Sequence, residues 1–205
     1  MKKLLPLLLL IISSKTTFSQ SSMLAQWDKK VLEKANTAKD AAYMTDQEKQ
    51  VIFLFNLARI NPPLFNQTIV PYFLDTIGYK NSVYVVSLRK TLSNTKAGQA
   101  LVPTQDLFEI AKDHAITMGK SGKKGHEGFE KRYKVALKTY KALVGENCSY
   151  GFDNALRIVM QLLIDEGAGD SGHRKNILDP IYTSTGVAIR EHKITKWNCV
   201  IAFGG

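Results

Sequence analysis

The sequence predicts an α+β fold in which several amphipathic helices precede a β-hairpin at the C-terminal end. Two stretches indicate helices: apolar residues recur at helical spacing after Thr45 and again after Thr104. A third observation indicates the hairpin: residues 183–192 and 196–205 are rich in β-branched and aromatic residues and are separated by a charged turn. No internal repeat or low-complexity linker divides the chain, so we expect one domain after an N-terminal extension.

The first 20 residues have the pattern of a secretory signal peptide. A basic start is followed by an apolar run from Leu4 to Ile12 and by a small polar stretch that ends at Gln20. The run is too short to span a bilayer, which takes about 20 apolar residues, and no later segment approaches that length. We therefore expect residues 1–20 to be removed, and the remaining chain to be a soluble secreted or periplasmic protein without a transmembrane segment.

The charge of the chain is basic. The formal net charge is +10, and removal of Lys2, Lys3 and Lys15 with the signal peptide leaves +7. Such a surface is either simply solvated or attracted to anionic polymers or lipid head groups outside the cell. The lysines are scattered and not interleaved with aromatic residues, so we expect no nucleic-acid partner. We also expect a monomer.

The N-terminal half is predicted to be helical. Residues 21–45 form a helical arm with one weakly apolar face, made of Leu24, Trp27, Val31 and Ala35. The next helix begins at Thr45, which forms a capping box with Glu48, and it ends before Pro62. Residues 70–95 are predicted to form one or two short helices joined by turns.

The C-terminal half supplies the polar residues of interest. A helix from Thr104 carries His114 in or beside its apolar stripe, which is typical of a structural histidine. His126 lies beyond this helix in a glycine-rich turn and has no such packing explanation. A further helix is predicted to begin with Asp153 as its N-cap and to end at Asp165 and Glu166, and residues 172–180, GHRKNILDP, are predicted to form a loop.

Two histidines outside helices, His126 and His173, are separated in sequence by the triplet GEN and by the acidic helix end at Asp165. Two imidazoles and one or two carboxylates are the ligand types of a zinc site. The spacing is not that of an HExxH pair on one helical face, so an ordinary set of surface polar residues explains it as well. His173 in a purely structural hydrogen bond is the alternative.

Several segments in a fixed order resemble a known family. They are FNLARINP at 55–62, the helix that ends near His126, GEN at 145–147, GHRKNIL at 172–178 and TGVAI at 185–189. Together they resemble the bacterial branch of the CAP superfamily, which includes cysteine-rich secretory proteins, antigen 5 and plant pathogenesis-related class 1 proteins. The resemblance implies a CAP domain over residues 46–205, folded as a three-layer α-β-α sandwich with a small, mostly antiparallel central sheet.

The resemblance also implies a surface cleft lined by two histidines and two acids, which hold a divalent metal such as zinc. The corresponding residues here are His126, Glu146, Asp165 and His173. The first two and His173 match the motifs directly, whereas the acid at Asp165 follows LLI instead of the family's aromatic-rich WxxE pattern, with Leu162 at the tryptophan position. An aspartate reaches one methylene less far, so Glu166 is the alternative fourth acid.

The only two cysteines are Cys148 and Cys199. In an exported chain such a pair suggests one disulfide, which would tie a loop carrying Glu146 to the last strand. Two buried or spare thiols are the alternative.

Three functions stay open. The first is a binding module for a small lipid or sterol, to which Phe65, Tyr72 and Phe73 would contribute an apolar groove. The second is a zinc-dependent hydrolase with Glu146 as general base. The third is an extracellular adhesion or interaction protein whose four cleft residues are structural. The sequence contains no serine in a nucleophile elbow, so binding is favoured over catalysis.

Overall fold

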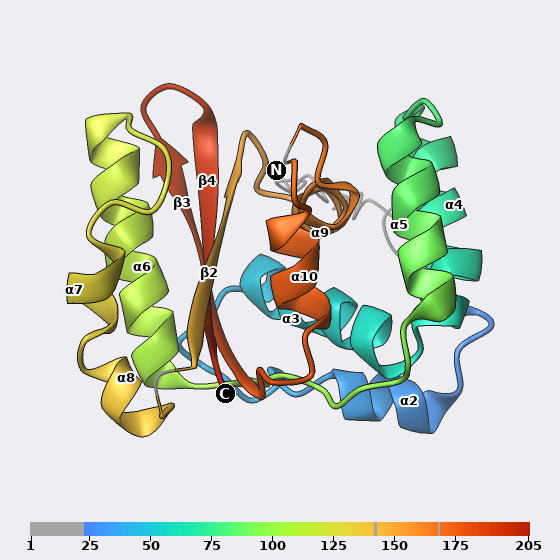
Figure 1. The fold of residues 1–205 in the computed structure, drawn as a ribbon, viewed down its shortest axis with the longest axis horizontal. Helices are drawn as coiled ribbons and strands as arrows, with labels where there is room; N and C mark the ends of the chain where they lie inside the picture. Colours follow the sequence, from blue (N-terminus) through green and yellow to red (C-terminus); the bar gives the residue numbers. More distant parts are fainter. Residues whose placement is uncertain (1–22, 142, 168) are drawn as a thin grey trace, which may run out of the picture.

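A computed structural model describes residues 23–141, 143–167 and 169–205, which fold into stacked layers around one sheet (Figure 1). The strand order is β1-β3-β4-β2. The strands are β1 (Val102–Pro103), β2 (Val144–Tyr150), β3 (Ser184–His192) and β4 (Lys196–Gly204). The short β1 pairs parallel with β3, and the other pairs are antiparallel. The predicted α-β-α sandwich with a small, mostly antiparallel sheet is therefore confirmed, and β3 and β4 form the predicted hairpin.

Helices cover both faces of this sheet (Figure 1). On one side lie α6 (Gln105–Ser121) and the short helices α7 (Phe129–Tyr133) and α8 (Ala136–Thr139). The other side is covered by α3 (Asp46–Ile60), α9 (Ala155–Ile164) and α10 (Gly172–Leu178). Beyond them lie α2 (Lys29–Ala35), α4 (Pro62–Ile77) and α5 (Val83–Asn94). Strand β2 is an edge strand of this sheet.

The capping box predicted at the start of α3 is present and has a second role. Thr45 and Glu48 bond reciprocally through side chain and backbone, which satisfies two free N–H groups of the helix. The other carboxylate oxygen of Glu48 accepts the N–H of Ile189 at 2.9 Å and a bond from Arg190 at 2.6 Å. The cap of α3 is thus also the point at which this helix is bonded to β3.

Helix α3 ends at the predicted place, but the chain does not leave helical structure there. Pro62 takes the first position of α4, where a missing N–H costs nothing and the fixed φ suits a helix. The single helix α4 extends to Ile77, so the segment predicted as a short helix from residue 70 is the end of a longer helix, whereas α5 lies within the second predicted stretch. Pro71 lies inside α4 without ending it.

The close packing of α6 on the sheet depends on one glycine. A Cβ atom built on Gly186 would lie 2.1 Å from the backbone nitrogen of Phe108. Only glycine therefore allows β3 to approach the first turn of α6 at this distance.

The segment before α3 packs into the core. Trp27 is 5% exposed, and its indole N–H donates to Thr68 on α4 at 3.0 Å. The predicted signal peptide, residues 1–20, lies outside the described residues. None of the described helices is both long enough and apolar enough to cross a membrane.

Two sequence predictions on the C-terminal half are wrong in detail. Asn154, and not Asp153, caps α9, with its side chain accepting the N–H of Arg157 at 3.1 Å. Residues 172–178, predicted as part of a loop, form α10, whose first turn carries His173.

The predicted disulfide is not present. Cys148 and Cys199 are both buried free thiols. In the β2–β4 register Cys199 pairs with Ser149, and paired residues share a face of the sheet. Because successive residues alternate between faces, the side chain of Cys148 points to the opposite face from that of Cys199. Glu146 lies on β2 itself, so no loop needs to be tied to the sheet.

Candidate functional site

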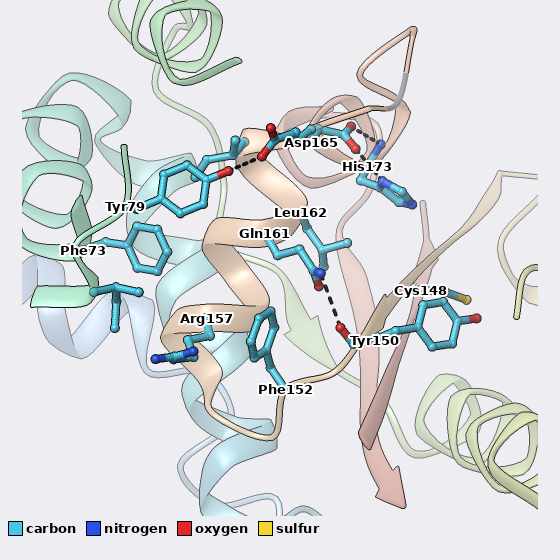
Figure 2. Close-up of a pocket in the computed structure, with 13 residues that line it drawn as sticks. Phe73, Tyr79, Cys148, Tyr150, Phe152, Arg157, Gln161, Leu162, Asp165 and His173 are labelled. Atoms are coloured by element: carbon cyan, nitrogen blue, oxygen red, sulfur yellow. Dashed lines mark hydrogen bonds and ion pairs between the residues drawn. The ribbon is translucent and has the colours of Figure 1, made fainter. Parts of the chain in front are cut away.

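A cleft of about 540 Å³ opens at the edge of the sheet, between α4, α9 and β2 (Figure 2). Its walls are largely apolar and include Phe73, Ile77, Phe152, Leu162 and Ile164. Polar side chains stand at its rim, among them Arg157, Asp165 and His173. An apolar cavity with a few convergent polar groups is the usual form of a small-molecule site.

The first histidine–acid pair lies at this rim. Asp165 ends α9 in the left-handed conformation, with φ 57°, which turns its carboxylate toward α10. One carboxylate oxygen accepts the Nδ1–H of His173 at 2.6 Å, and the other accepts the backbone N–H of His173 at 3.0 Å (Figure 2). Burial by itself would raise the pKa of Asp165, but the hydrogen bonds and the charge of His173 outweigh burial and lower it.

Asp165 and Glu166 have different environments. Asp165 is 4% exposed and bonds His173, whereas Glu166 is exposed and accepts the hydroxyl of Tyr79 on the opposite wall. Burial and then the bond to Glu166 raise the pKa of Tyr79 to about 12. Of the two acids left open by the sequence, Asp165 is the one that meets a histidine.

The second pair is centred on Glu146 of β2, which is 6% exposed. One of its oxygens accepts the Nδ1–H of His126 at 2.9 Å. The carboxylate also accepts hydrogen bonds from both terminal nitrogens of Arg132. The Tyr133 hydroxyl adds a bond at 3.2 Å. Burial would raise the pKa of Glu146, but the hydrogen bonds from His126 and Arg132 outweigh burial and lower it.

The two pairs lie on either side of strand β2. Asn147, next to Glu146 on the strand, points to the other face, where its amide donates to the carbonyl of His173 at 2.9 Å. Asn176 of α10 bonds the same amide at 2.8 Å. Cys148 connects the two sides, since its sulfur lies 3.8 Å from Nδ1 of His126 and the residue lines the cleft together with His173. The four predicted residues are therefore arranged as two histidine–carboxylate pairs around one strand.

A second group of residues of metal-ligand types includes Glu146 and buried residues next to it. His114, Glu146 and Cys148 are all buried, and their donor atoms lie within 4.8 Å of one another. These donors are already engaged: Nε2 of His114 bonds the carbonyl of Gly125 at 2.9 Å, and Arg132 neutralises Glu146. Burial, followed by the charge of Glu146, raises the pKa of the Cys148 thiol. This donor set fits a hydrogen-bonded network better than a metal site, and the structural role predicted for His114 agrees with its bond to Gly125.

Sequence reasoning missed the residues that bond the two pairs, namely Arg132, Tyr133 and Asn147, and it also missed Tyr79, which bonds Glu166 at the cleft. The alternation of side chains along a strand would have placed Glu146 and Cys148 on one face and Asn147 on the other, had residues 144–150 been recognised as a strand. The contacts of Arg132 and Tyr79 have no comparable local pattern.

Residues 55–201 match the family model described as CAP, the cysteine-rich secretory protein family. The chain belongs to this family. Both histidine–carboxylate pairs of this CAP protein, His126–Glu146 and His173–Asp165, lie within the matched segment.

Two solved structures are similar to this CAP protein. One is an outer surface protein from Borrelia burgdorferi, with a TM-score of 0.42 and 20% identity, covering 60% of this chain and 88% of that chain. The other is a cysteine-rich secretory protein from Staphylococcus aureus, with a TM-score of 0.39 and 19% identity, covering 62% and 40% of the two chains. Neither similarity bears on function.

One curated protein, large ribosomal subunit protein uL5c from Oltmannsiellopsis viridis, is 30% identical over 107 residues. The aligned segment is 50% of this chain and 59% of that protein, so this chain spans less than two thirds of that relative.

Proposed function

We propose that this CAP protein binds a small, mainly apolar ligand of the lipid or sterol class in the cleft between α4, α9 and β2. The observation that carries the proposal is the cleft itself, whose volume of about 540 Å³ falls within the range of small-molecule sites. Phe73, which is buried and 4% exposed, and Leu162, at 2%, present apolar surface to it. The predicted signal peptide supports binding outside the cytoplasm.

The polar rim indicates how such a ligand would be oriented. His173 is held by two bonds to Asp165, so its ring has a defined direction at one end of the cleft. Arg157, stacked over Phe152 with its guanidinium 5.4 Å from the ring centre, is a cation at the same rim. A ligand with an apolar body and one hydroxyl or carboxylate group satisfies both features.

Ligand binding is tested by filling the cleft. Ile77→Trp places a large side chain in the cavity, and the chain from Ser21 to Gly205 is titrated with a fluorescent fatty acid, cis-parinaric acid, and with dehydroergosterol. We expect at least about tenfold weaker binding than in the parent. Ile181→Trp, at an exposed residue outside the cleft, is the matched control and should bind like the parent. Equal affinity in all three proteins contradicts the proposal.

We propose zinc as a second ligand of the same region. Each imidazole is bonded through Nδ1 to a carboxylate, and in the described part of the chain neither Nε2 atom of His126 or His173 has a hydrogen-bond partner. Carboxylate–histidine pairs of this kind orient imidazoles toward zinc. The donor chemistry therefore fits, with the two histidines as ligands and the two acids as the groups that orient them. A bound zinc ion would supply Lewis acidity beside the cleft.

Calorimetric titration tests this second proposal. We expect saturable binding of about one zinc equivalent to the parent, lost in His126→Ala and in His173→Ala. Glu33→Ala, at an exposed acid of α2, should bind zinc like the parent. Zinc binding that persists in both alanine variants would show that the two histidines do not share an ion.

The hydrolase alternative is less well supported than binding. A general base works best when its pKa lies near the working pH. Glu146 is instead bonded to Arg132, Tyr133 and His126, and its pKa is lowered. A hydrolase activity that is present in the parent and lost in Glu146→Gln would favour catalysis over binding.

A further inference from the structure

We propose that the β3–β4 turn and the end of α6 form a docking surface for a membrane rich in anionic lipid. We call this surface the basic tip, and it consists of Lys120, Lys123, Lys124, Lys193, Ile194 and Lys196. Figure 1 shows the hairpin turn beside the C-terminal end of α6. None of these residues lines the cleft, although Lys124 lies 5.3 Å from the ring centre of Tyr150, which does. The inference uses no property of the proposed ligand.

A buried histidine joins the two loops of the basic tip. His192 is 3% exposed, and its Nδ1 accepts the backbone N–H groups of Ile194 and Thr195, both at 3.2 Å. Nδ1 is therefore unprotonated and Nε2 carries the proton, which it donates to the carbonyl of Lys123 at 2.9 Å. The N–H of Lys193 also donates to the carbonyl of Gly119 at 3.0 Å. The surface is consequently preorganised, and binding would not have to order it.

The charge of the basic tip is strongly positive. Lys123 forms an ion pair with Glu127 at 3.1 Å. Within the described residues no carboxylate pairs with the other four lysines, and Glu191 is the exposed acid beside them. Each lysine that faces an anionic bilayer raises the partition coefficient of the protein onto that bilayer about fivefold.

The apolar residues distinguish a membrane from other polyanions. Ile194, at the turn, is 69% exposed, although a turn position would ordinarily be polar. Trp197, partly buried, lines a shallow groove of about 820 Å³ together with Lys193 and Lys196. Tryptophan favours the head-group level of a bilayer, and an isoleucine beside it can enter the acyl boundary. A soluble polyanion would use the lysines but would leave Ile194 without a role.

The test measures partitioning to vesicles of phosphatidylcholine with or without phosphatidylglycerol. The chain from Ser21 to Gly205 is used, because it contains the whole described core, from Met23 to Phe203, and lacks the apolar run of residues 4–12. We expect binding only to the anionic vesicles, with quenching of Trp197 by brominated lipid. Trp27 is buried and bonded to Thr68, so it should not be quenched.

Two variants separate the contributions of charge and apolar contact. Lys193→Glu with Lys196→Glu should weaken partitioning at least about 25-fold. The matched control, Lys29→Glu with Lys34→Glu on the distant α2, makes the same change in net charge and should cost no more than about threefold. Ile194→Ser should reduce partitioning about tenfold and lessen the quenching of Trp197. The thermal unfolding midpoints of all variants should match that of the parent, because these side chains are exposed.

Three results would overturn the proposal. In the first, anionic vesicles do not bind the parent. In the second, reversal of charge at the tip costs no more than reversal on α2. In the third, Ile194→Ser binds like the parent while charge reversal abolishes binding both to vesicles and to heparin, which would identify the basic tip as a site for soluble polyanions.

Discussion

At the scale of single residues, His126 and His173 are each oriented by a carboxylate that is itself buried. Asp165 accepts the Nδ1–H and the backbone N–H of His173, so one side chain fixes both the orientation of the imidazole ring and the position of the first turn of α10. Glu146 does the same for the ring of His126 and is held by Arg132. The two acids therefore serve to position the histidines.

Removal of the Asp165 charge tests this role. In metal-free protein at pH 7, we predict that Asp165→Asn lowers the free energy of unfolding by about 1–3 kcal/mol, because an amide cannot replace both bonds as an acceptor. The exposed Asp153→Asn is the control, with a change under about 0.5 kcal/mol. Chemical denaturation in EDTA measures both, and equal stability of the two variants would contradict the prediction.

The Asp165–His173 pair predicts that the free energy of unfolding depends on pH. The pKa of Asp165 is lower in the folded protein than its ordinary value. Such a carboxylate contributes stability that is present above its unfolded pKa of about 4 and is lost as the pH falls through its folded pKa. Below about pH 4 the unfolding free energy of the parent should therefore fall more steeply than that of Asp165→Asn. Parallel curves in EDTA would show that Asp165 does not contribute.

At the scale of elements, the position of the short helix α10 depends on a buried arginine of α3. Arg59 is 2% exposed, and its guanidinium donates to the carbonyls of Gln99, Ile177, Asp179 and Tyr182 at 2.7–2.8 Å. These bonds join α3 to the end of α10 and to the segment that leads into β3. A seven-residue helix has little stability of its own, so it relies on such contacts.

We predict that Arg59→Met destabilises the protein by at least about 3 kcal/mol, because four carbonyls lose their donor. Lys90→Met, on the exposed side of α5, should change stability by less than about 0.5 kcal/mol. Thermal unfolding followed by circular dichroism compares the two variants. A small effect of Arg59→Met would show that water replaces the guanidinium.

At the scale of the whole molecule, the sheet keeps the two cysteines apart. Cys148 faces the α6 layer and Cys199 faces the α3 layer, and burial raises the pKa of both thiols. A thiol in this state is a poor nucleophile. We predict slow alkylation by iodoacetamide at pH 8 in the native protein and two alkylated thiols after denaturation without reductant. Mass spectrometry that shows no alkylation without reductant would indicate a disulfide.

The local sequence determined the beginning of α3 and the terminal hairpin, and the CAP motifs named the four residues that form the two histidine–carboxylate pairs. The capping box at Thr45, the β-branched and aromatic residues of 183–205 and the ordered CAP motifs are all read from neighbours in sequence, since caps and strand propensity act over a few residues. The extent of α4 was not predictable in this way, because Pro62 and Pro71 are compatible with both a helix end and a helix.

Only the tertiary structure decided how the two histidines and two acids pair, which acid bonds His173, and which face of the sheet each cysteine takes. Arg132, Asn147 and Arg59 act on partners that packing brings near, and Arg59 reaches Tyr182 across 123 positions of sequence. The sequence by itself therefore determined the family and the fold class. Which side chains meet depends on strand register and helix docking, and these follow from the burial of the whole core and not from any short segment.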